Sequence, residues 1–371
     1  MNGLLVRTAA ALAAIFFSGA GCTTAPLPNL PAPVGEDATI FVPGYKGSFL
    51  SEASGEHAWI TPGQALGGGD RSLALPVEGV ELGPHFGPLH PDGPLTKLSI
   101  LGIGPQIYGG FLEAGRGNLP GLVAFGYDWR ADVRDSGRAL CERIEALPAR
   151  RVAIVAHSMG GLVALSCLKQ GAKKISRVAF VGTPFAGSPL IMKDLFRGDA
   201  VGRNKALLSA EALLTFAAAF QLLPPKPDFF VDESGKPVAI QAFSEPFWTE
   251  RGAAVFADAA RRQDGPWLAQ LKKMIAAHDG LYEGLAGFAP AVEALAIVGT
   301  GHPTVSGVLV AQGKLDFDHP PGADGDGTVT AVSARPAFPH REVTSLAAHG
   351  ELLNDREVQR AIIDFIAGAD R

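Results

Sequence analysis

The chain is poor in cysteine, and no disulfide framework is expected to hold the fold together. Only three cysteines occur among its 371 residues, Cys22, Cys141 and Cys167. The last two fall in predicted helices, where buried free thiols are the expected state. A single disulfide between them is the alternative that the sequence leaves open.

Charge is also scarce. Charged residues make up 19% of the sequence, the formal net charge is −5, and no block of lysine or arginine occurs. This composition argues against nucleic acid as a partner. Hydrophobic residues reach 47%, which is enough to build a sizeable core.

The N-terminal apolar stretch is too short for a permanent membrane span. It runs from Ala9 to Phe17, follows Arg7 and is followed by small residues, a layout that predicts a signal peptide over residues 1–21. The small residues before Cys22 resemble the lipobox of bacterial lipoproteins, which implies that Cys22 is lipidated. An ordinary signal peptide cut near the same place is the alternative.

Residues 22–37 are rich in proline and predict a stiff, extended tether. The tether would hold the folded part, residues 38–369, away from a membrane surface. The residue after Cys22 is Thr23, not aspartate. In the lipoprotein analogy, the absence of an aspartate at this position points to the outer rather than the inner membrane of a bacterial envelope.

Beyond the tether, short apolar runs alternate with helical patterns, which predicts an α/β fold with a mostly parallel sheet covered on both faces. The runs are residues 38–42, 122–125, 151–156, 177–181, 295–298 and 341–345. The clearest helical patterns between and after them are residues 132–147, 162–170 and 354–367.

One stretch, about residues 188–290, breaks this alternation with apolar helical segments and proline-rich joints. It predicts an inserted helical cap over the functional site. The run 206–230 is apolar around most of a helical circumference, so it could line an acyl-chain pocket together with Phe247, Trp248 and Trp267. A core helix of a small extra layer is the alternative.

The pentapeptide from Ala156 to Gly160 lies between a predicted strand and a predicted helix, with Ser158 at its centre. A nucleophile elbow needs this context, because the tight turn lifts the serine hydroxyl out of the sheet edge. Small residues must flank the serine, as Ala156 and Gly160 do. Ser158 is therefore the candidate nucleophile, and a glycine-rich turn ahead of a helix is the plain alternative.

A serine nucleophile requires a base, and the expected chain order is serine, acid, histidine. The histidines after the elbow are His278, His302, His319, His340 and His349. His349 directly follows the last predicted strand, where a loop could bring it to the serine. His340 precedes that strand and would fall at the wrong edge.

The candidate acid lies in the glycine-rich loop at residues 323–329, which contains Asp324 and Asp326. Asp326 precedes Gly-Thr-Val and is the preferred acid; Asp324 is its rival, and Asp316 and Asp318 lie upstream. A calcium loop is a poor interpretation, because the distal bidentate glutamate is missing. No metal is expected.

Two backbone N–H groups are expected to form an oxyanion hole. One is that of Met159, directly after the nucleophile. The other should come from the loop after the first strand, where Tyr45 follows Pro43-Gly44.

Together these motifs resemble the lecithin:cholesterol acyltransferase family, which includes lysosomal phospholipase A2 and phospholipid:diacylglycerol acyltransferase. The motifs are FVPGYKGS at 41–48, YDWR at 127–130, AHSMGG at 156–161, GTPFAGSP at 182–189, GTGHPT at 299–304, DGDGTV at 324–329 and the late His349. The resemblance spans roughly residues 38 to 368. It implies an α/β-hydrolase fold with a cap after GTPFAGSP, Asp326 as the acid and Tyr45 as an oxyanion donor. The family's disulfides find no counterpart in Cys141 and Cys167.

The expected function is acyl-ester chemistry on lipid, either hydrolysis of the phospholipase type or O-acyl transfer to an alcohol. A carboxylesterase for small soluble esters and a catalytically idle lipid-binding surface lipoprotein are the alternatives. The expected partners are a lipid or ester substrate and, through Cys22, a membrane surface. No organic cofactor and no obligate protein partner are expected.

Overall fold

The computed structural model describes residues 35–97 and 107–368. The predicted signal peptide, the lipidation site Cys22 and most of the tether lie outside the described residues and stay predictions. Within the described residues, none of the helices combines the length and the apolar character that a membrane crossing requires.

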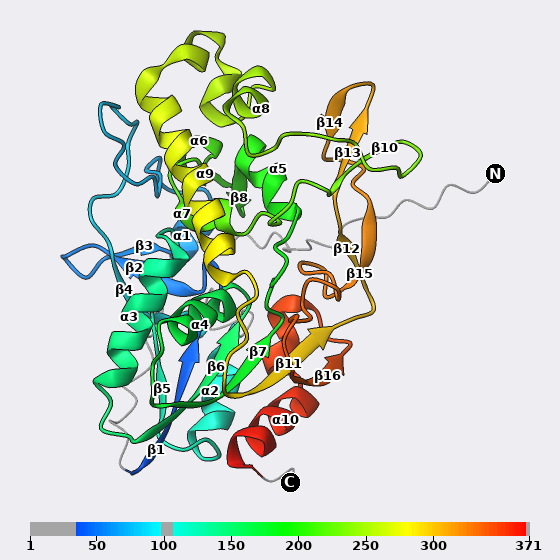
Figure 1. Cartoon of the computed structure of the whole chain (residues 1–371). Helices are drawn as coiled ribbons and strands as arrows, with labels where there is room; N and C mark the ends of the chain where they lie inside the picture. Colours follow the sequence, from blue (N-terminus) through cyan, green and yellow to red (C-terminus); the bar gives the residue numbers. More distant parts are fainter. Residues whose placement is uncertain (1–34, 98–106, 369–371) are drawn as a thin grey trace.

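Six parallel strands form the central sheet, in the order β16-β11-β7-β6-β1-β5 (Figure 1). Their bounds are β1 (Asp37–Val42), β5 (Leu122–Ala124), β6 (Arg151–His157), β7 (Ile175–Val181), β11 (Glu293–Gly299) and β16 (Arg341–Ser345). Each strand coincides with one of the six predicted apolar runs. The predicted fold class is therefore confirmed: the chain has an α/β-hydrolase fold.

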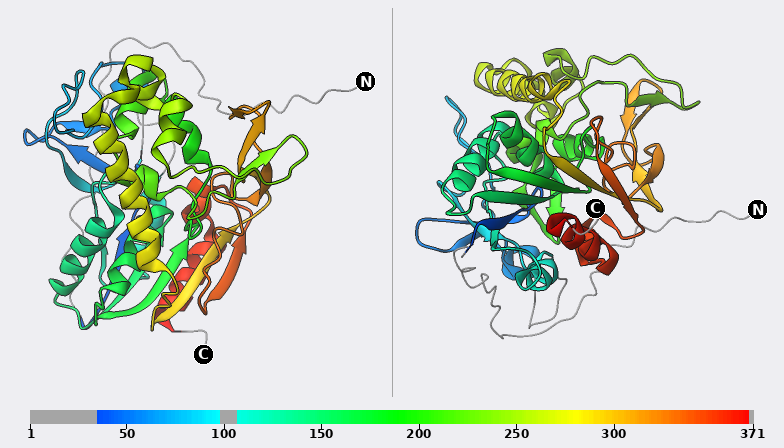
Figure 2. Two further views of the ribbon diagram at one scale, coloured as in Figure 1. Left: turned by 45° about the horizontal axis from the view of Figure 1, so that its top comes forward. Right: turned by 60° about the horizontal axis from the view of Figure 1, so that its bottom comes forward.

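Successive strand residues are buried on opposite faces of the sheet. On β1, Ile40 and Val42 join the core that includes α3 (Val133–Glu145) and α4 (Met159–Lys169). Phe41 joins a second core with α2 (Gly109–Arg116) and α10 (Arg356–Ala367) on the other face (Figure 2, right). Burial of both faces explains why the strands are continuous apolar runs.

A disulfide joins Cys141 of α3 to Cys167 of α4, so the expectation of free thiols was wrong. The two helices pack closely: a Cβ on Gly137 would lie 2.7 Å from the Ser166 side chain. The cysteine Cα atoms are consequently 5.4 Å apart, within the range that a disulfide bridges. A strand separates the two helices in sequence, so only their packing brings the cysteines together.

Between β7 and β11 the chain forms a helical layer beyond the carboxyl ends of the strands (Figure 1). Its elements are α5 (Leu190–Arg197), β8 (Asp199–Val201), β9 (Asn204–Leu208), α6 (Ala210–Leu213), α7 (Ala217–Gln221), β10 (Phe230–Asp232), α8 (Glu245–Glu250), the 3₁₀ turns η1 (Ala254–Ala257) and η2 (Ala259–Gln263), and α9 (Gly265–Leu285). We call this segment the helical layer.

The apolar run 206–230 is not one helix, as its composition suggested, but two short helices between short strands. Ser209 starts α6 afresh, because its side chain accepts a hydrogen bond from the N–H of Ala212. Phe216 then adopts an extended conformation that separates α6 from α7. Trp248 and Trp267 are fully buried, as in the alternative of a small extra core.

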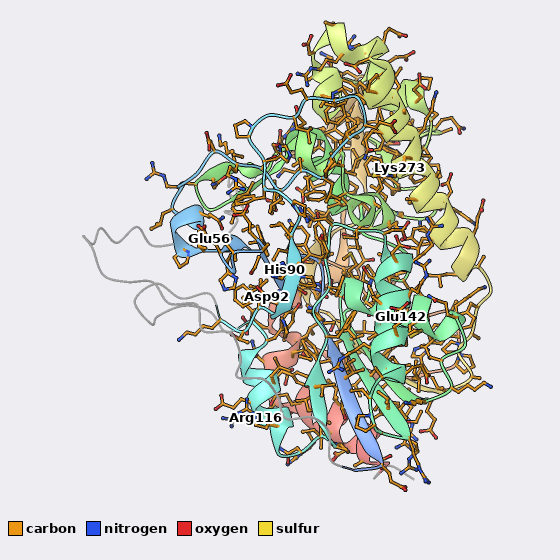
Figure 3. All side chains as sticks on the ribbon, turned by 90° about the vertical axis from the view of Figure 1, so that its left-hand side faces the viewer. Glu56, His90, Asp92, Arg116, Glu142 and Lys273 are labelled. Carbon is orange, nitrogen blue, oxygen red and sulfur yellow. A yellow bond between two sulfur atoms is a disulfide. The ribbon has the colours of Figure 1, made fainter. Side chains whose placement is uncertain are left out.

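A second excursion, between β1 and β5, had no sequence signal. It contains β2 (Ser48–Ser51), β3 (His57–Trp59), α1 (Pro62–Ala65) and β4 (His90–Pro94), and Glu56, His90 and Asp92 mark it in Figure 3. The backbone of Leu73 bonds to Leu207 of the helical layer, so the two insertions pack together. Four more strands follow β11: β12 (His302–Val305), β13 (Val308–Ala311), β14 (Lys314–Asp316) and β15 (Gly322–Gly325).

Candidate active site

Ser158 stands in a strained turn between β6 and α4. Its φ is 53° and its ψ is −129°, a conformation that side-chain-bearing residues rarely adopt. The turn needs glycine at position 160, because a Cβ there would collide with the carbonyl oxygens of Val42 and Pro43. The Ser158 N–H donates to the carbonyl of Val181, at 2.8 Å. Both neighbouring strands therefore hold the serine at the carboxyl edge of the sheet.

The structure brings Ser158, His349 and Asp326 together. His349 opens the 3₁₀ turn η3 (His349–Asn354), directly after β16. Its Nε2 lies 2.9 Å from Ser158 Oγ, and its Nδ1 lies 2.7 Å from Asp326 Oδ2. With Nδ1–H donating to the carboxylate, Nε2 is free to accept the serine hydroxyl proton.

Asp326 is 1% exposed and is held as a carboxylate. Burial pushes the pKa of Asp326 up, but the hydrogen bond and charge of His349 and the N–H groups of Thr328 and Val329 outweigh it and hold that pKa below its usual value. The two N–H groups donate to Oδ1, at 2.9 and 2.7 Å. Oδ2 is therefore left to orient His349.

The rival carboxylates and histidines make other contacts. Asp324 accepts from Gly301, Asp316 from His319 and Asp318 from Arg197. His278, His302 and His340 contact the carbonyls of Pro224, Leu346 and Phe338.

The loop after β1 passes against the serine. A Cβ on Gly44 would lie 2.8 Å from Ser158 Cβ, so only glycine permits this approach. Tyr45 follows Gly44 in the chain, and Met159 follows Ser158 as the first residue of α4. The two residues predicted to supply oxyanion donors are thus the chain neighbours of Gly44 and of Ser158. We call residues 43–47 the oxyanion loop.

Side chains of the YDWR motif form hydrogen bonds with this loop and with Ser48, the residue after it. The Tyr127 hydroxyl donates to the carbonyl of Pro43, at 2.9 Å, and Trp129 donates to the carbonyl of Ser48, at 3.1 Å. Arg130 pairs with Asp128 at 2.7 Å. Tyr127 and Trp129 are buried, so they act as packing residues.

Two residues near the serine had not been singled out. His157, directly before the nucleophile, is buried and contacts both Tyr108 and the His349 backbone. Burial, with the neighbouring His349 charge, lowers the pKa of His157 to about 3. His157 lies inside the elbow pentapeptide and could have been noticed there, whereas nothing in the sequence marks Tyr108.

Residues 114–251 match the family described as lecithin:cholesterol acyltransferase. This part of the chain is similar to that family. The match covers α3, the elbow and much of the helical layer, so the resemblance predicted from the motifs is confirmed there. Within the described residues there is no group of three or more side chains that could hold a metal ion.

Among curated proteins, the uncharacterized protein YJR098C of Saccharomyces cerevisiae is 30% identical over 205 residues, which are 53% of this chain and 30% of that protein. The chain thus matches less than a third of the length of this relative. Among solved structures, a chain of the Tle4–Tli4 complex superposes with a TM-score of 0.59 at 16% identity, covering 90% of this chain and 99% of that one. The mature lipase BlEst2 of Bacillus licheniformis has a TM-score of 0.41 at 13% identity, covering 92% and 96%. The first of these structures supports the fold.

Proposed function

We propose that the chain is a serine-dependent enzyme that transfers acyl groups from lipid esters to water or to an alcohol. The observation that carries this proposal is the continuous hydrogen-bond chain from Ser158 Oγ through His349 to Asp326. The family match over residues 114–251 supports acyl-ester hydrolysis or acyl transfer as the type of chemistry.

In the first half-reaction, Ser158 Oγ attacks the ester carbonyl while His349 Nε2 takes the hydroxyl proton. Asp326 stabilises the resulting imidazolium. His349 then returns the proton to the leaving alcohol, and the acyl group stays on Ser158. In the second half-reaction, water or an acceptor alcohol attacks this acyl-enzyme with the same histidine as base.

The backbone N–H groups of Met159 and Tyr45 are proposed to stabilise the oxyanion. Their support is positional: Met159 starts α4 directly after the nucleophile, and the oxyanion loop touches Ser158 at Gly44. One such donor is worth about 10²–10³-fold in kcat.

Lipid is the proposed acyl donor because the family that residues 114–251 match is named for acyl transfer from lecithin, a phospholipid. The helical layer has an apolar interior of its own, in which Phe216, Phe220, Leu223, Trp248 and Trp267 are packed away from solvent. Ser158 is only 8% exposed beneath it, so an ester must enter a largely dry environment. An idle lipid-binding protein would not require the aligned Ser158, His349 and Asp326.

The test uses protein made from residue 26 onward, on a phosphatidylcholine dispersion that contains a sterol, with every acyl product identified. Ser158→Ala should lower kcat by about 10³-fold or more. A matched control is Ser166→Ala, which removes another buried hydroxyl from α4 and should leave the rate within a few-fold.

Serine-dependent release of fatty acid alone would identify a phospholipase-type hydrolase, and serine-dependent sterol ester an acyltransferase. If neither forms, p-nitrophenyl esters of increasing chain length test the small-ester alternative, which a rate that falls with chain length would support. Activity in Ser158→Ala within a few-fold of wild type would refute the proposed function.

A further inference from the structure

A second hydrogen-bond chain crosses the site beside the Ser158–His349–Asp326 chain. The Gly44 N–H donates to Tyr108 Oη at 3.0 Å, Tyr108 Oη lies 3.0 Å from His157 Nδ1, and His157 Nε2 lies 3.0 Å from the His349 carbonyl oxygen. It therefore joins the oxyanion loop to the backbone of the residue placed as the base. All of its side-chain members are buried.

The direction of each bond follows from its two ends. The His349 carbonyl can only accept, so His157 Nε2 must carry the proton and donate. His157 Nδ1 of the neutral ring must then accept, and only the Tyr108 hydroxyl can donate to it. The Tyr108 oxygen keeps a lone pair for the Gly44 N–H. Each donor and each acceptor along the chain thus has one partner of the right kind.

This chain cannot carry a proton to the reaction, because it ends on a backbone N–H and a backbone carbonyl. Its effect is geometric. The oxyanion loop turns around the Tyr108 hydroxyl: the Gly47 N–H donates to the Gly44 carbonyl at 3.0 Å, and a Cβ on Gly47 would lie 2.9 Å from Tyr108 Oη. Tyr108 itself is fixed by edge-on packing against Phe41 of β1, at 4.9 Å.

We propose that Tyr108 and His157 are positioning residues that hold the oxyanion loop and the His349 loop at a fixed separation across Ser158. This inference rests on the proposed function. The Tyr45 N–H directly follows Gly44, so a shift of the loop at Gly44 moves the oxyanion donor away from the developing charge. Because preorganised donors act over a narrow range of positions, loosening this chain should weaken transition-state binding more than substrate binding.

Burial keeps the His157 ring neutral, which suits this role. Its ring lies 4.8 Å from the His349 ring, and a positive charge there would oppose the imidazolium that His349 becomes during catalysis. The pKa of His157, lowered to about 3, keeps the ring uncharged at any ordinary pH. Tyr108 likewise stays protonated, because burial raises its pKa above the ordinary value.

The first test is Tyr108→Phe, which removes both bonds of the hydroxyl and keeps the ring against Phe41. With the p-nitrophenyl ester that the wild type cleaves fastest, kcat should fall about 10- to 100-fold while KM changes less than threefold. The reason is that Tyr108→Phe leaves the buried Gly44 N–H and His157 Nδ1 unpaired. A trifluoromethyl ketone with the same acyl chain forms a hemiketal oxyanion on Ser158. Its affinity should fall by a factor matching that of kcat.

Phe111→Leu is the matched control. Phe111 lies on α2, whose N-cap residue is Tyr108, and it also packs against Phe41, at 5.4 Å, but it has no polar group. The control should lose stability without losing affinity for the ketone. An equal loss of ketone affinity in both variants, or a Tyr108→Phe enzyme within threefold of wild type, would overturn the inference.

If Tyr108→Phe does not fold, His157→Gln and His157→Leu take its place. Gln keeps a neutral donor for the His349 carbonyl, whereas Leu keeps none, so Gln should retain at least tenfold more activity. Equal activity of the two would reject the role of His157. Ser158→Ala is measured alongside: if it stays active, the proposed function itself fails, whereas a Ser158-dependent enzyme that is indifferent to Tyr108→Phe refutes only the positioning role.

Discussion

The sheet side of the site and the helical layer above it differ in how their buried carboxylates are held. On the sheet side, the side chains of Ser158, His349, Asp326 and His157 all have hydrogen-bond partners. The buried hydroxyls that lack a partner among the residues that the structure describes are those of Thr39 on β1, Thr183 just after β7 and Tyr45 in the oxyanion loop. The four site side chains are therefore set for one geometry by their own hydrogen bonds.

The two carboxylates are Asp326 and Asp194. Hydrogen bonds from His349 and two backbone N–H groups lower the pKa of Asp326 despite its burial. Burial raises the pKa of Asp194, on α5 of the helical layer, to about 6, and the nearby Lys46 offsets this only in part. The hydrogen-bonded Asp326 carboxylate is held ready to orient His349, whereas the poorly solvated Asp194 carboxylate lowers stability. We infer that the reaction is carried out by the sheet-side residues. Substitutions of these residues should therefore lower kcat by the same factor for all esters.

The largest expected effect comes from the sheet side. Asp326→Asn should lower kcat by about 10³–10⁴-fold, because the amide no longer fixes the His349 tautomer or stabilises the imidazolium. The factor should be the same for short and long acyl chains, as measured with a series of p-nitrophenyl esters. Asp324→Asn, two residues away with its carboxylate on the Gly301 N–H, should remain within a few-fold of wild type. A similar loss in both variants would contradict the assignment.

The disulfide offers a smaller effect, on stability alone. It closes a loop of 26 residues between α3 and α4, and such a loop is worth about 3–4 kcal/mol. In the variant with Cys141→Ser and Cys167→Ser, the free energy of unfolding should fall by that amount, so the variant should unfold at a lower urea concentration. Its kcat at 25 °C should stay within twofold of wild type. Wild type treated with reductant is the control. An unchanged midpoint after reduction would show that the bond does not stabilise the fold.

Much of the sheet side could be predicted from the sequence, because its signals are local. Buried parallel strands are short apolar runs, and the elbow requires small residues such as Gly160 around Ser158. The chain order then left His349 as the preferred base. The free-thiol expectation failed because the proximity of Cys141 and Cys167 depends on helix packing.

The segments outside the central sheet were less predictable. Strand β4 reads His-Pro-Asp-Gly-Pro, which lacks every usual strand signal. Tyr108 reaches His157 from 49 positions away, so no local pattern reveals the contact. The break inside residues 206–230 is different, because Ser209 is an ordinary helix N-cap and could have been recognised.

The smallest expected effect tests the layer side through pH. Burial raises the pKa of Asp194 in the folded protein to about 6, from an ordinary value of 3.8. Between these values the folded state binds more protons than the unfolded state, so this group makes stability fall as pH rises from about 4 to about 6. Above pH 6 the penalty is complete.

Asp194→Asn removes that penalty. The variant should be more stable than wild type by about 1–3 kcal/mol at pH 7.5, and the gain should disappear near pH 4. Urea unfolding at both pH values measures it. Asp199→Asn provides the contrast, because Asp199 pairs with Lys46 at 2.5 Å and its loss should leave stability unchanged or lower by up to about 1 kcal/mol. If Asp194→Asn shows no gain at pH 7.5, the Asp194 carboxylate is adequately solvated, and its contrast with Asp326 fails.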